Sequence, residues 1–401
     1  MFSNRAARYA MFGLIYFAEG AILSYFTALN SLYLLSFNLS MSQVGLIGMI
    51  ALIPFVIKIF FGMLSDRFNF LRLGYRKPYI LLGLFVQCLC LVVVPGINPG
   101  EQFGLFALLA FVLMSGQALY DTCTDGLALD TTPKEEEGTI QGIMVGGRAL
   151  GVVLISAALG WTVQNFSWSG AFWLLAILTL LPLPLVLWAR EPQRAAGRRF
   201  EWRAFSAFTH WPVIALGLVG ALYSLVINAA NQIVNPFLQQ QFGIDYASAG
   251  LFTTIWGIGV AVGGLTGGRL VDSLGHRRSL VAAVGVSLAG VLLLAFTPSL
   301  AAAFVLVVLF GLAFGYYETV YFAISMNLTD PRIAASMFAI LMAVANVGTG
   351  VGLGSSGALV DGIGFRLTFA VVAALNLLVL PLIPGVFRKP APTDAAAAVV
   401  E

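Results

Sequence analysis

Six ionisable side chains stand inside long apolar segments of this chain, where proton transfer or ion binding is chemically possible. They are Glu19, Lys58, Asp121, Asp125, Arg148 and Glu318. An ionised side chain at the centre of a bilayer costs about 2.5 to 3.5 kcal/mol on insertion scales, so it usually faces a cavity or a partner. The set therefore predicts a polar pathway for protons and charged solutes within membrane-spanning helices.

Asp121 and Asp125 lie four residues apart, so both project from one face of a helix. Two carboxylates at that spacing repel each other, which favours a basic partner, Lys58 or Arg148, or retention of a proton. A neutralised network that only holds helices together is an equal alternative for Asp125 and Arg148, because intramembrane pairs often serve packing.

Glu318 has no other ionisable group near mid-depth in its half of the chain. Low dielectric favours the protonated form of a carboxylic acid, which can then load and release a proton as its access alternates. We predict Glu318 as the first proton carrier and Glu19 as the second, with Asp121 and Asp125 as further coupling residues. The alternative is a permanently protonated Glu318 that is hydrogen-bonded to Tyr317 or Tyr321.

Four amides form a polar stripe on an otherwise apolar helix, at Asn228, Asn231, Gln232 and Asn235. Amides that faced lipid would be costly, and they both donate and accept hydrogen bonds, as recognition of heterocycles, amides and sugars requires. The alternative is hydrogen bonding to the helix that carries Asn346. The predicted substrate-binding residues are Lys58, Arg148, Asn228, Asn231, Gln232, Asn235, Tyr317 and Asn346.

The elements that must position these residues are membrane helices, because 59% of the 401 residues are hydrophobic and only 10% are charged. Soluble proteins carry about 25% charged residues. Twelve spans of about 20 residues fit the apolar segments, the first of them retained rather than cleaved. They are 9–36, 42–64, 78–97, 103–130, 138–164, 169–189, 211–240, 247–270, 279–297, 300–328, 334–360 and 365–387. The predicted fold class is an all-α membrane protein.

Positive charges predict the orientation of the chain. Of its 21 Lys and Arg, 18 fall in the two terminal segments and in every second loop, whereas the opposite side holds Arg366 alone. Under the positive-inside rule both termini are cytoplasmic, in a multi-pass protein of the inner (plasma) membrane. The net charge of +3 is then a topology signal, and no nucleic-acid signature accompanies it.

The two halves repeat each other. Sliding them by 197 residues places Tyr120-Asp121-Thr122 on Tyr317-Glu318-Thr319 and Gly160 on Gly357. We predict a six-helix bundle over 1–189, a cytoplasmic linker over 190–209, a second six-helix bundle over 210–389 and a disordered tail over 390–401. Parallel repeats of this kind place a substrate path between the halves.

A repeated loop follows the second helix of each half, in G-x-L-S-D-R at Gly62 and in a weaker copy at Gly268. We predict close backbone approach at both glycines and a cytoplasmic latch between the halves. The predicted gate residues are Gly62, Asp66, Arg67, Arg76, Asp272 and Arg277. The alternative is that the arginines only fix topology.

The loop pattern, followed by G-Y-R-K-P and repeated after six helices, resembles the major facilitator superfamily. PFVIKIFFGMLSD with GYRKPY looks like the folate/biopterin transporter and muropeptide permease families, which share a lysine, acids and an arginine that match Lys58, Asp121, Asp125, Asp130 and Arg148 here. The resemblance implies a twelve-helix secondary transporter that works by alternating access. It also implies proton-coupled symport of an anionic organic solute such as a folate, a pterin or a muropeptide-like compound.

Two other functions stay open: a proton-coupled exporter of drugs or metabolites, and a non-transporting pigment or complex-assembly factor on the same fold. An enzyme is not expected, because His210 and His276 lie too far apart for a metal site and no glycine-rich segment matches a phosphate-binding loop. We expect no cofactor and no metal. The expected partners are a small-molecule substrate, protons and the lipid bilayer, for a protein that acts as a monomer.

Overall fold

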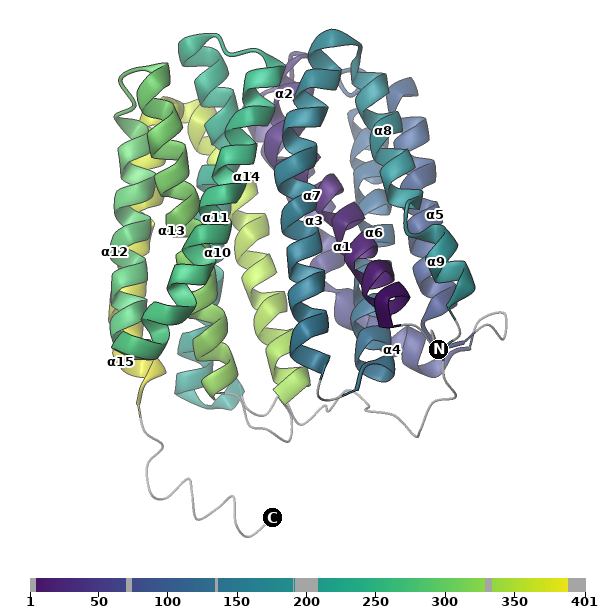
Figure 1. Cartoon of the computed structure of the whole chain (residues 1–401). Coiled ribbons are helices and arrows are strands. Elements are labelled where there is room, and N and C mark those ends of the chain that lie inside the picture. The colour runs from purple at the N-terminus through teal and green to yellow at the C-terminus, as the bar shows by residue number, and fades with distance from the viewer. Residues whose placement is uncertain are drawn as a thin grey trace.

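The computed structural model describes residues 5–69, 74–133, 136–189, 191, 208–328 and 334–388. In these residues the chain is helical, as predicted, and it contains no strand (Figure 1). The first half contains α1 Arg5–Ala28, α2 Asn30–Leu35, α3 Met41–Val56, α4 Lys58–Arg67, α5 Lys77–Val93, η2 Val94–Gly96, α6 Phe103–Thr131, α7 Glu137–Asn165, α8 Trp168–Leu180 and α9 Leu183–Trp188. The second half contains α10 Trp211–Phe242, α11 Tyr246–Leu274, α12 His276–Ala295, α13 Leu300–Leu328, α14 Ala334–Leu375, η5 Asn376–Leu382 and α15 Ile383–Val386.

Eleven helical segments of the described chain are long and apolar enough to cross a membrane. The last, Met337–Val386, has 50 residues and would extend about 75 Å, more than twice the hydrocarbon thickness of about 30 Å. It contains a non-helical residue, Gly364, at φ 77° and ψ 168°. That left-handed conformation suits glycine and reverses the chain, so the segment makes the last two of the twelve predicted passes.

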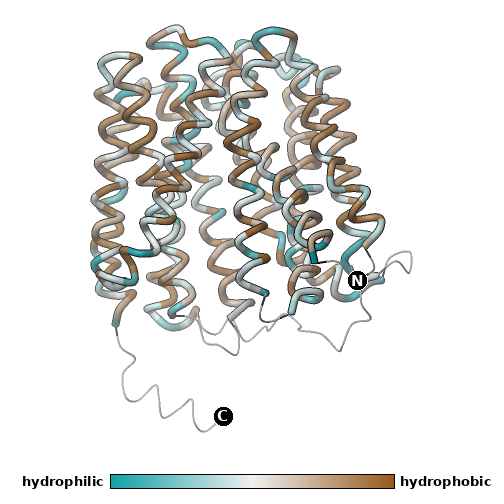
Figure 2. The backbone as a smooth tube through the Cα atoms, viewed as in Figure 1, coloured by the Kyte–Doolittle hydropathy of each residue, from teal (hydrophilic) through white to brown (hydrophobic). Residues whose placement is uncertain are grey.

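The outward faces of the helices suit lipid. On α5, Leu82, Phe85 and Leu89 are 43%, 63% and 52% exposed at helical spacing, whereas Leu84 and Leu91 are buried. Hydrophobic residues, brown in Figure 2, recur along the length of the helices. α1 begins and α15 ends at the same end of the molecule (Figure 1), and we call the opposite end the distal end.

A break in the second membrane span positions Lys58. Pro54 lies inside α3 and cannot donate a backbone hydrogen bond, and the helix ends at Val56. Ile57 has φ −95° and ψ 6°, and Lys58 is the first residue of α4. The proline therefore places this lysine at a kink in the span.

Glycines bring α1 and α7 into backbone contact. A Cβ added to Gly20 would collide with the backbone of Arg148, and one added to Gly151 would collide with the carbonyl oxygen of Phe17. The repeat-related pair α10 and α14 packs the same way, with Gly348 against the carbonyl of Ala221. This close packing, which small residues allow in membranes, brings the residues next to the glycines within reach of each other.

The predicted close backbone approach at the repeated loop is found in neither copy, although Gly62 packs on a side chain. A Cβ added to Gly62 would lie 3.3 Å from the side chain of Thr122, so α4 and α6 are tightly packed there. At Gly268 nothing lies within 4 Å of the added Cβ, so the prediction was wrong at that position. In α11 the contact falls one residue earlier, because Gly267 packs on Tyr316.

Candidate functional site

Two ion pairs lie near the middle of the first half. Arg148 Nη1 on α7 is 3.3 Å from Glu19 Oε1 on α1, and Lys58 Nζ on α4 is 3.2 Å from Asp121 Oδ2 on α6. Both carboxylates are buried, at 5% and 6% exposure of the side chain, whereas Arg148 and Lys58 are 40% and 30% exposed. The basic groups are thus the accessible members of each pair.

Tyr16 connects the two pairs. Its hydroxyl donates a hydrogen bond to Asp125 Oδ1 on α6, and the Arg148 guanidinium lies 5.9 Å from the centre of its ring. We call Tyr16, Glu19, Lys58, Asp121, Asp125 and Arg148 the charge cluster. It draws on α1, α4, α6 and α7, so it depends on the packing of four helices.

The partners within the charge cluster differ in part from those expected from sequence. Lys58 pairs with Asp121, which was one of the two basic partners expected for the acids of α6. Arg148, the other expected partner, pairs with Glu19 instead. Tyr16 was missed as the partner of Asp125. Its position three residues before Glu19, on the same helix face, was the available signal.

Glu318 on α13 lies across from the charge cluster. It is half-buried, and within the described chain it makes no hydrogen bond or ion pair; Arg148 is close enough for their charges to interact. Among the described residues the expected alternative, a hydrogen bond to a neighbouring tyrosine, is not found: the Tyr317 hydroxyl is buried without a partner there, and the Tyr321 hydroxyl donates to Leu341 O at 3.4 Å. Arg148 therefore stands between an acid of each half.

The carboxyl groups outnumber the cations here. Lys58 and Arg148 can balance Asp121 and Glu19, which leaves Asp125 and Glu318 without a cation. Each of these two acids must hold a proton or remain charged in a low-dielectric setting, which is costly. The arrangement can therefore bind protons, and an acid that becomes protonated releases its basic partner.

Three of the four predicted amides bond neighbouring helices. Asn228 Nδ2 donates to Thr349 Oγ1 at 3.2 Å, and Gln232 Nε2 donates to Leu353 O at 2.9 Å, both on α14. Asn235 Nδ2 donates to the carbonyl oxygen of Ala28, the last residue of α1, at 2.9 Å. In this conformation Asn228 and Gln232 bond the helix that carries Asn346, which was the alternative for the stripe, whereas Asn235 bonds α1 and α11.

Asn231 differs, because it lines a small pocket at the junction of the halves. Thr27 of α1, Thr253 and Trp256 of α11 share the lining. The Trp256 indole Nε1 is buried there and has no hydrogen-bond partner in the described chain. The pocket thus offers neutral hydrogen-bond donors and acceptors beside α1, the helix that also carries Tyr16 and Glu19 of the charge cluster.

Asn346, also predicted to bind substrate, instead donates to Phe55 O at 3.2 Å.

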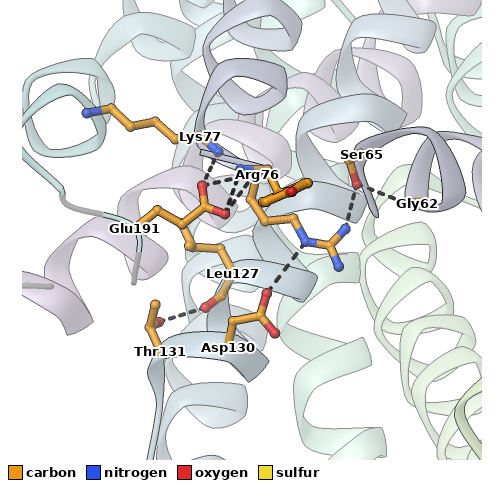
Figure 3. Close-up of polar contacts among 9 residues, drawn as sticks. Gly62, Ser65, Arg76, Lys77, Leu127, Asp130, Thr131 and Glu191 are labelled. Carbon is orange, nitrogen blue, oxygen red and sulfur yellow. Dashed lines mark hydrogen bonds and ion pairs between the residues drawn. The ribbon is translucent and has the colours of Figure 1, made fainter. Parts of the chain in front are cut away.

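Of the predicted gate residues, Gly62 and Arg76 take part in a polar cluster, which lies within the first half rather than between the halves (Figure 3). Arg76 Nη1 donates to Ser65 Oγ at 2.5 Å, and Arg76 Nε lies 3.7 Å from Asp130 Oδ2. Glu191 accepts from the backbone N–H groups of Tyr75, Arg76 and Lys77 at 2.8 to 3.1 Å. Arg76 thereby joins the end of α4 to the end of α6, and Glu191 caps α5.

Glu191 was not expected from sequence, although an acid directly after the sixth span was the available signal. Removing it by Glu191→Ala leaves the first N–H groups of α5 without their acceptor and should lower the free energy of unfolding by about 1 kcal/mol. Thermal unfolding in detergent measures the change, with Glu101→Ala, an exposed acid of a loop, as the matched control. Equal melting temperatures for the Glu191 variant and the unchanged protein would contradict the capping role.

The other gate residues take no part in this cluster. Arg67 is exposed on α4. Asp272 and Arg277, in the second copy, are exposed and form no hydrogen bond or ion pair with described residues. The side chain of Asp66, most of the linker 190–209 and the tail from 389 lie outside the described part of the chain.

Hydrogen bonds between the halves run from the distal end to mid-depth. At the distal end Ser42 donates to Asp361 and Tyr246 donates to Gln164, and nearer the middle Thr254 donates to Val153 O at 2.7 Å. The Asn346–Phe55 bond is the deepest of these. The halves are therefore held together on the side away from both termini.

Comparison with known proteins gives consistent results. The sequence profile described as Major Facilitator Superfamily matches residues 11–230 and 216–400. The anhydromuropeptide permease of Escherichia coli (strain K12) is 26% identical over 393 residues, which cover 94% of this chain and 79% of that protein.

Two solved structures share the fold. The nucleoside transporter NupG has a TM-score of 0.79 at 13% identity, covering 96% of this chain and 99% of its own. A bacterial homolog of the human lysosomal transporter Spinster has a TM-score of 0.76 at 18% identity, covering 96% and 97%. At these identities the two structures support the fold alone.

Proposed function

The chain belongs to the Major Facilitator Superfamily and is a multi-pass secondary transporter, not an enzyme, and from that premise we propose that it carries an anionic organic solute together with protons by alternating access. The observation that carries the proposal is the position of Arg148. It is an accessible cation near mid-depth, paired with an acid of the first half and within the field of an acid of the second.

An anion and a proton would support each other's binding at this position. While Glu19 is ionised, it forms an ion pair with the Arg148 guanidinium. A solute carboxylate would bind the same planar group, so the two carboxylates compete for it. A proton on Glu19 or on Glu318 lowers the negative charge around Arg148 and frees it for the solute. The bound anion in turn disfavours a second negative charge on that acid, so it helps to hold the proton there. This reciprocity is the basis of symport.

The second ion pair offers a second anchor of the same kind. Lys58 is 30% exposed beside its buried partner Asp121, and the kink after Pro54 holds it at the start of α4. Protonation of Asp121 would free this ammonium group for another anionic group of the solute. Two separated cations favour a solute with a carboxylate or phosphate over a neutral one.

The neutral pocket suggests what the rest of the solute carries. When the junction of the halves opens, Asn231 and the indole N–H of Trp256, which is buried without a partner in the described chain, would be able to bind amide or hydroxyl groups of the solute. Asn231 and Thr27 lie nearer the distal end than Glu19 does. Along α1, Thr27 is about 12 Å from Glu19, at 1.5 Å per residue. We therefore propose an elongated anion with a polar, neutral body. The relative named anhydromuropeptide permease makes muropeptide-like compounds the first class to test, before folates and pterins.

We further propose that both termini are cytoplasmic, as the distribution of Lys and Arg favours. The distal end is then the outer face, and the structure represents an inward-facing conformation whose outer side is closed. A solute would enter from outside after this side opens.

The test is uptake into proteoliposomes, with anhydromuropeptides, folate and biopterin as labelled solutes. We expect one class to accumulate when the outside is more acidic than the lumen, and to accumulate far less when a protonophore collapses the gradient. Accumulation only under the inverted gradient would indicate exchange with protons, as in an exporter. No uptake of any anion, combined with uptake of a neutral solute, would overturn the assignment of Arg148.

A further inference from the structure

We propose that Asp361 and Gln164 form a pair of repeat-related latches that hold the distal side of the transporter closed, with Asp361 the stronger of the two. The proposal rests on the alternating access proposed above, because a latch matters only if this side also opens. It concerns the outer gate, whereas the gate predicted from sequence concerns the opposite side.

Asp361 reaches from the second half to the start of α3 in the first half. Its carboxylate accepts from Met41 N at 3.1 Å, from Ser42 N at 2.7 Å and from Ser42 Oγ at 2.5 Å. Three donors thus converge on one carboxylate at a helix N-terminus, where the helix dipole favours negative charge. Hydrogen bonds to an ionised group are stronger than those between neutral groups.

The N-terminus of α3 is fully satisfied only through this contact. Gln43 N donates to the N-cap Ser40 Oγ, and Val44 N donates to Ser40 O. The two remaining N–H groups of the first turn, those of Met41 and Ser42, donate to Asp361. When the distal side opens, these two groups must exchange a carboxylate for water.

The internal repeat places a second contact of the same design across the interface. Gln164 lies 197 residues before Asp361, the offset that relates the halves. Its Oε1 accepts from the backbone N–H of Tyr246, the first residue of α11, at 3.2 Å. By the same repeat, α11 corresponds to α3, so each half supplies an acceptor to the helix start of the other.

Glycines one turn before each acceptor bring the helices together. Gly357 lies four residues before Asp361, and a Cβ added there would collide with the carbonyl of Met41. Gly160 lies four residues before Gln164, and a Cβ added there would collide with the carbonyl of Tyr246. The backbone approach and the hydrogen bond therefore recur as a unit at both positions.

The two latches differ in strength. Asp361 is charged and accepts three hydrogen bonds, whereas Gln164 is neutral and accepts one. Both acceptors are exposed, so water competes for their donors and the effect of each is moderate. The difference makes Asp361 the residue that sets how readily the distal side opens.

Asp245 supplies a matched control. It is also an exposed aspartate at a distal helix N-terminus, but it accepts from Ser248 N at 2.8 Å within its own helix. The hydrogen bonds from Ser248 hold the pKa of Asp245 below its ordinary value, so it is a charged cap like Asp361. Its bonds do not cross between the halves, and opening would not break them.

The experiment measures the distance between spin labels on the distal loops of the two halves. Cysteines for labelling replace Gly100 and Ser299 in a chain whose Cys88, Cys90 and Cys123 are alanine. When the latch residues are unchanged, we expect mainly the short distance between the two labels, which corresponds to a closed distal side. In Asp361→Ala the ratio of long to short distances should rise roughly tenfold, and in Gln164→Ala roughly twofold to threefold.

Asp245→Ala should leave the distance distribution unchanged. Asp361→Asn keeps the size of the side chain and serves if the alanine variant does not fold, as judged by its elution as a single species. Unchanged distributions in the Asp361 variants, while added solute still produces the long distance, would overturn the latch alone. A short distance that persists in every variant and with added solute would overturn alternating access as well, and an equal shift in Asp245→Ala would reduce the effect to helix capping.

Discussion

Arg148→Ala should reduce solute uptake by roughly a hundredfold or more, because it removes the accessible cation that both halves share. Truncation of one member of a buried, hydrogen-bonded ion pair also leaves the other member unpaired, here Glu19 at 5% side-chain exposure. Counterflow exchange in proteoliposomes, which needs no proton gradient, measures whether the solute itself is still carried.

A double variant separates binding of the solute from simple charge balance. In Glu19→Gln combined with Arg148→Ala the acid that paired with Arg148 no longer carries a charge, so folding should recover while counterflow stays low. Arg148→Lys keeps the charge but loses the planar fork, and we expect partial activity with a raised KM. Recovery of counterflow in the double variant would show that Arg148 only neutralises Glu19.

Glu318→Gln should uncouple transport from protons. Glu318 faces Arg148 from the second half and has no hydrogen-bond or ion-pair partner in the described chain, so its proton can exchange without breaking a fixed contact. Gradient-driven accumulation should fall about tenfold or more, whereas counterflow at equal pH should stay within about twofold. Both are measured with the same labelled solute.

Glu101→Gln is the matched control for Glu318. Glu101 is an exposed acid of a loop outside the membrane-spanning helices, so loss of its charge should change neither accumulation nor counterflow strongly. If Glu318→Gln retains full accumulation, coupling does not pass through this residue, and Glu19 and Asp125 become the acids to replace next. Loss of counterflow in Glu318→Gln would instead assign Glu318 to solute binding.

Much of the fold follows from composition and repetition. Long apolar segments of membrane-spanning length leave helices as the only way to satisfy the backbone, and the 197-residue offset relates the two halves. The turn between the last two passes also agrees, because Gly364 lies between the predicted spans 334–360 and 365–387. The close approach expected at Gly268 is absent, because a glycine shows where backbone contact is possible and not whether a partner is present.

The partners within the charge cluster were harder to predict than its members. Sequence spacing shows that Asp121 and Asp125 share a helix face, but not which of several cations lies opposite. That choice depends on glycine packing between α1 and α7, which brings Arg148 to Glu19. The Tyr16 hydroxyl could not be assigned in advance, because a tyrosine in a membrane helix is equally suited to packing.

The amide stripe illustrates a different limit. Its spacing correctly places Asn228, Gln232 and Asn235 where polar groups meet, but each amide can bond a neighbouring helix as well as a solute. Periodicity identifies the inward face of a helix and leaves the bonding partner open. Asp361 escaped notice for a related reason: it lies at the end of a span, where an acid normally faces water.

Proton movement caused by the solute alone tests the central claim most directly. Proteoliposomes at equal internal and external pH, with an internal pH-sensitive dye and a membrane potential clamped to zero, receive the anion identified by the uptake screen. We expect the lumen to acidify as the solute enters, and Glu318→Gln to carry solute without that acidification. Solute entry with no change of internal pH in the unaltered protein, or with alkalinisation, would contradict symport of the anion with protons.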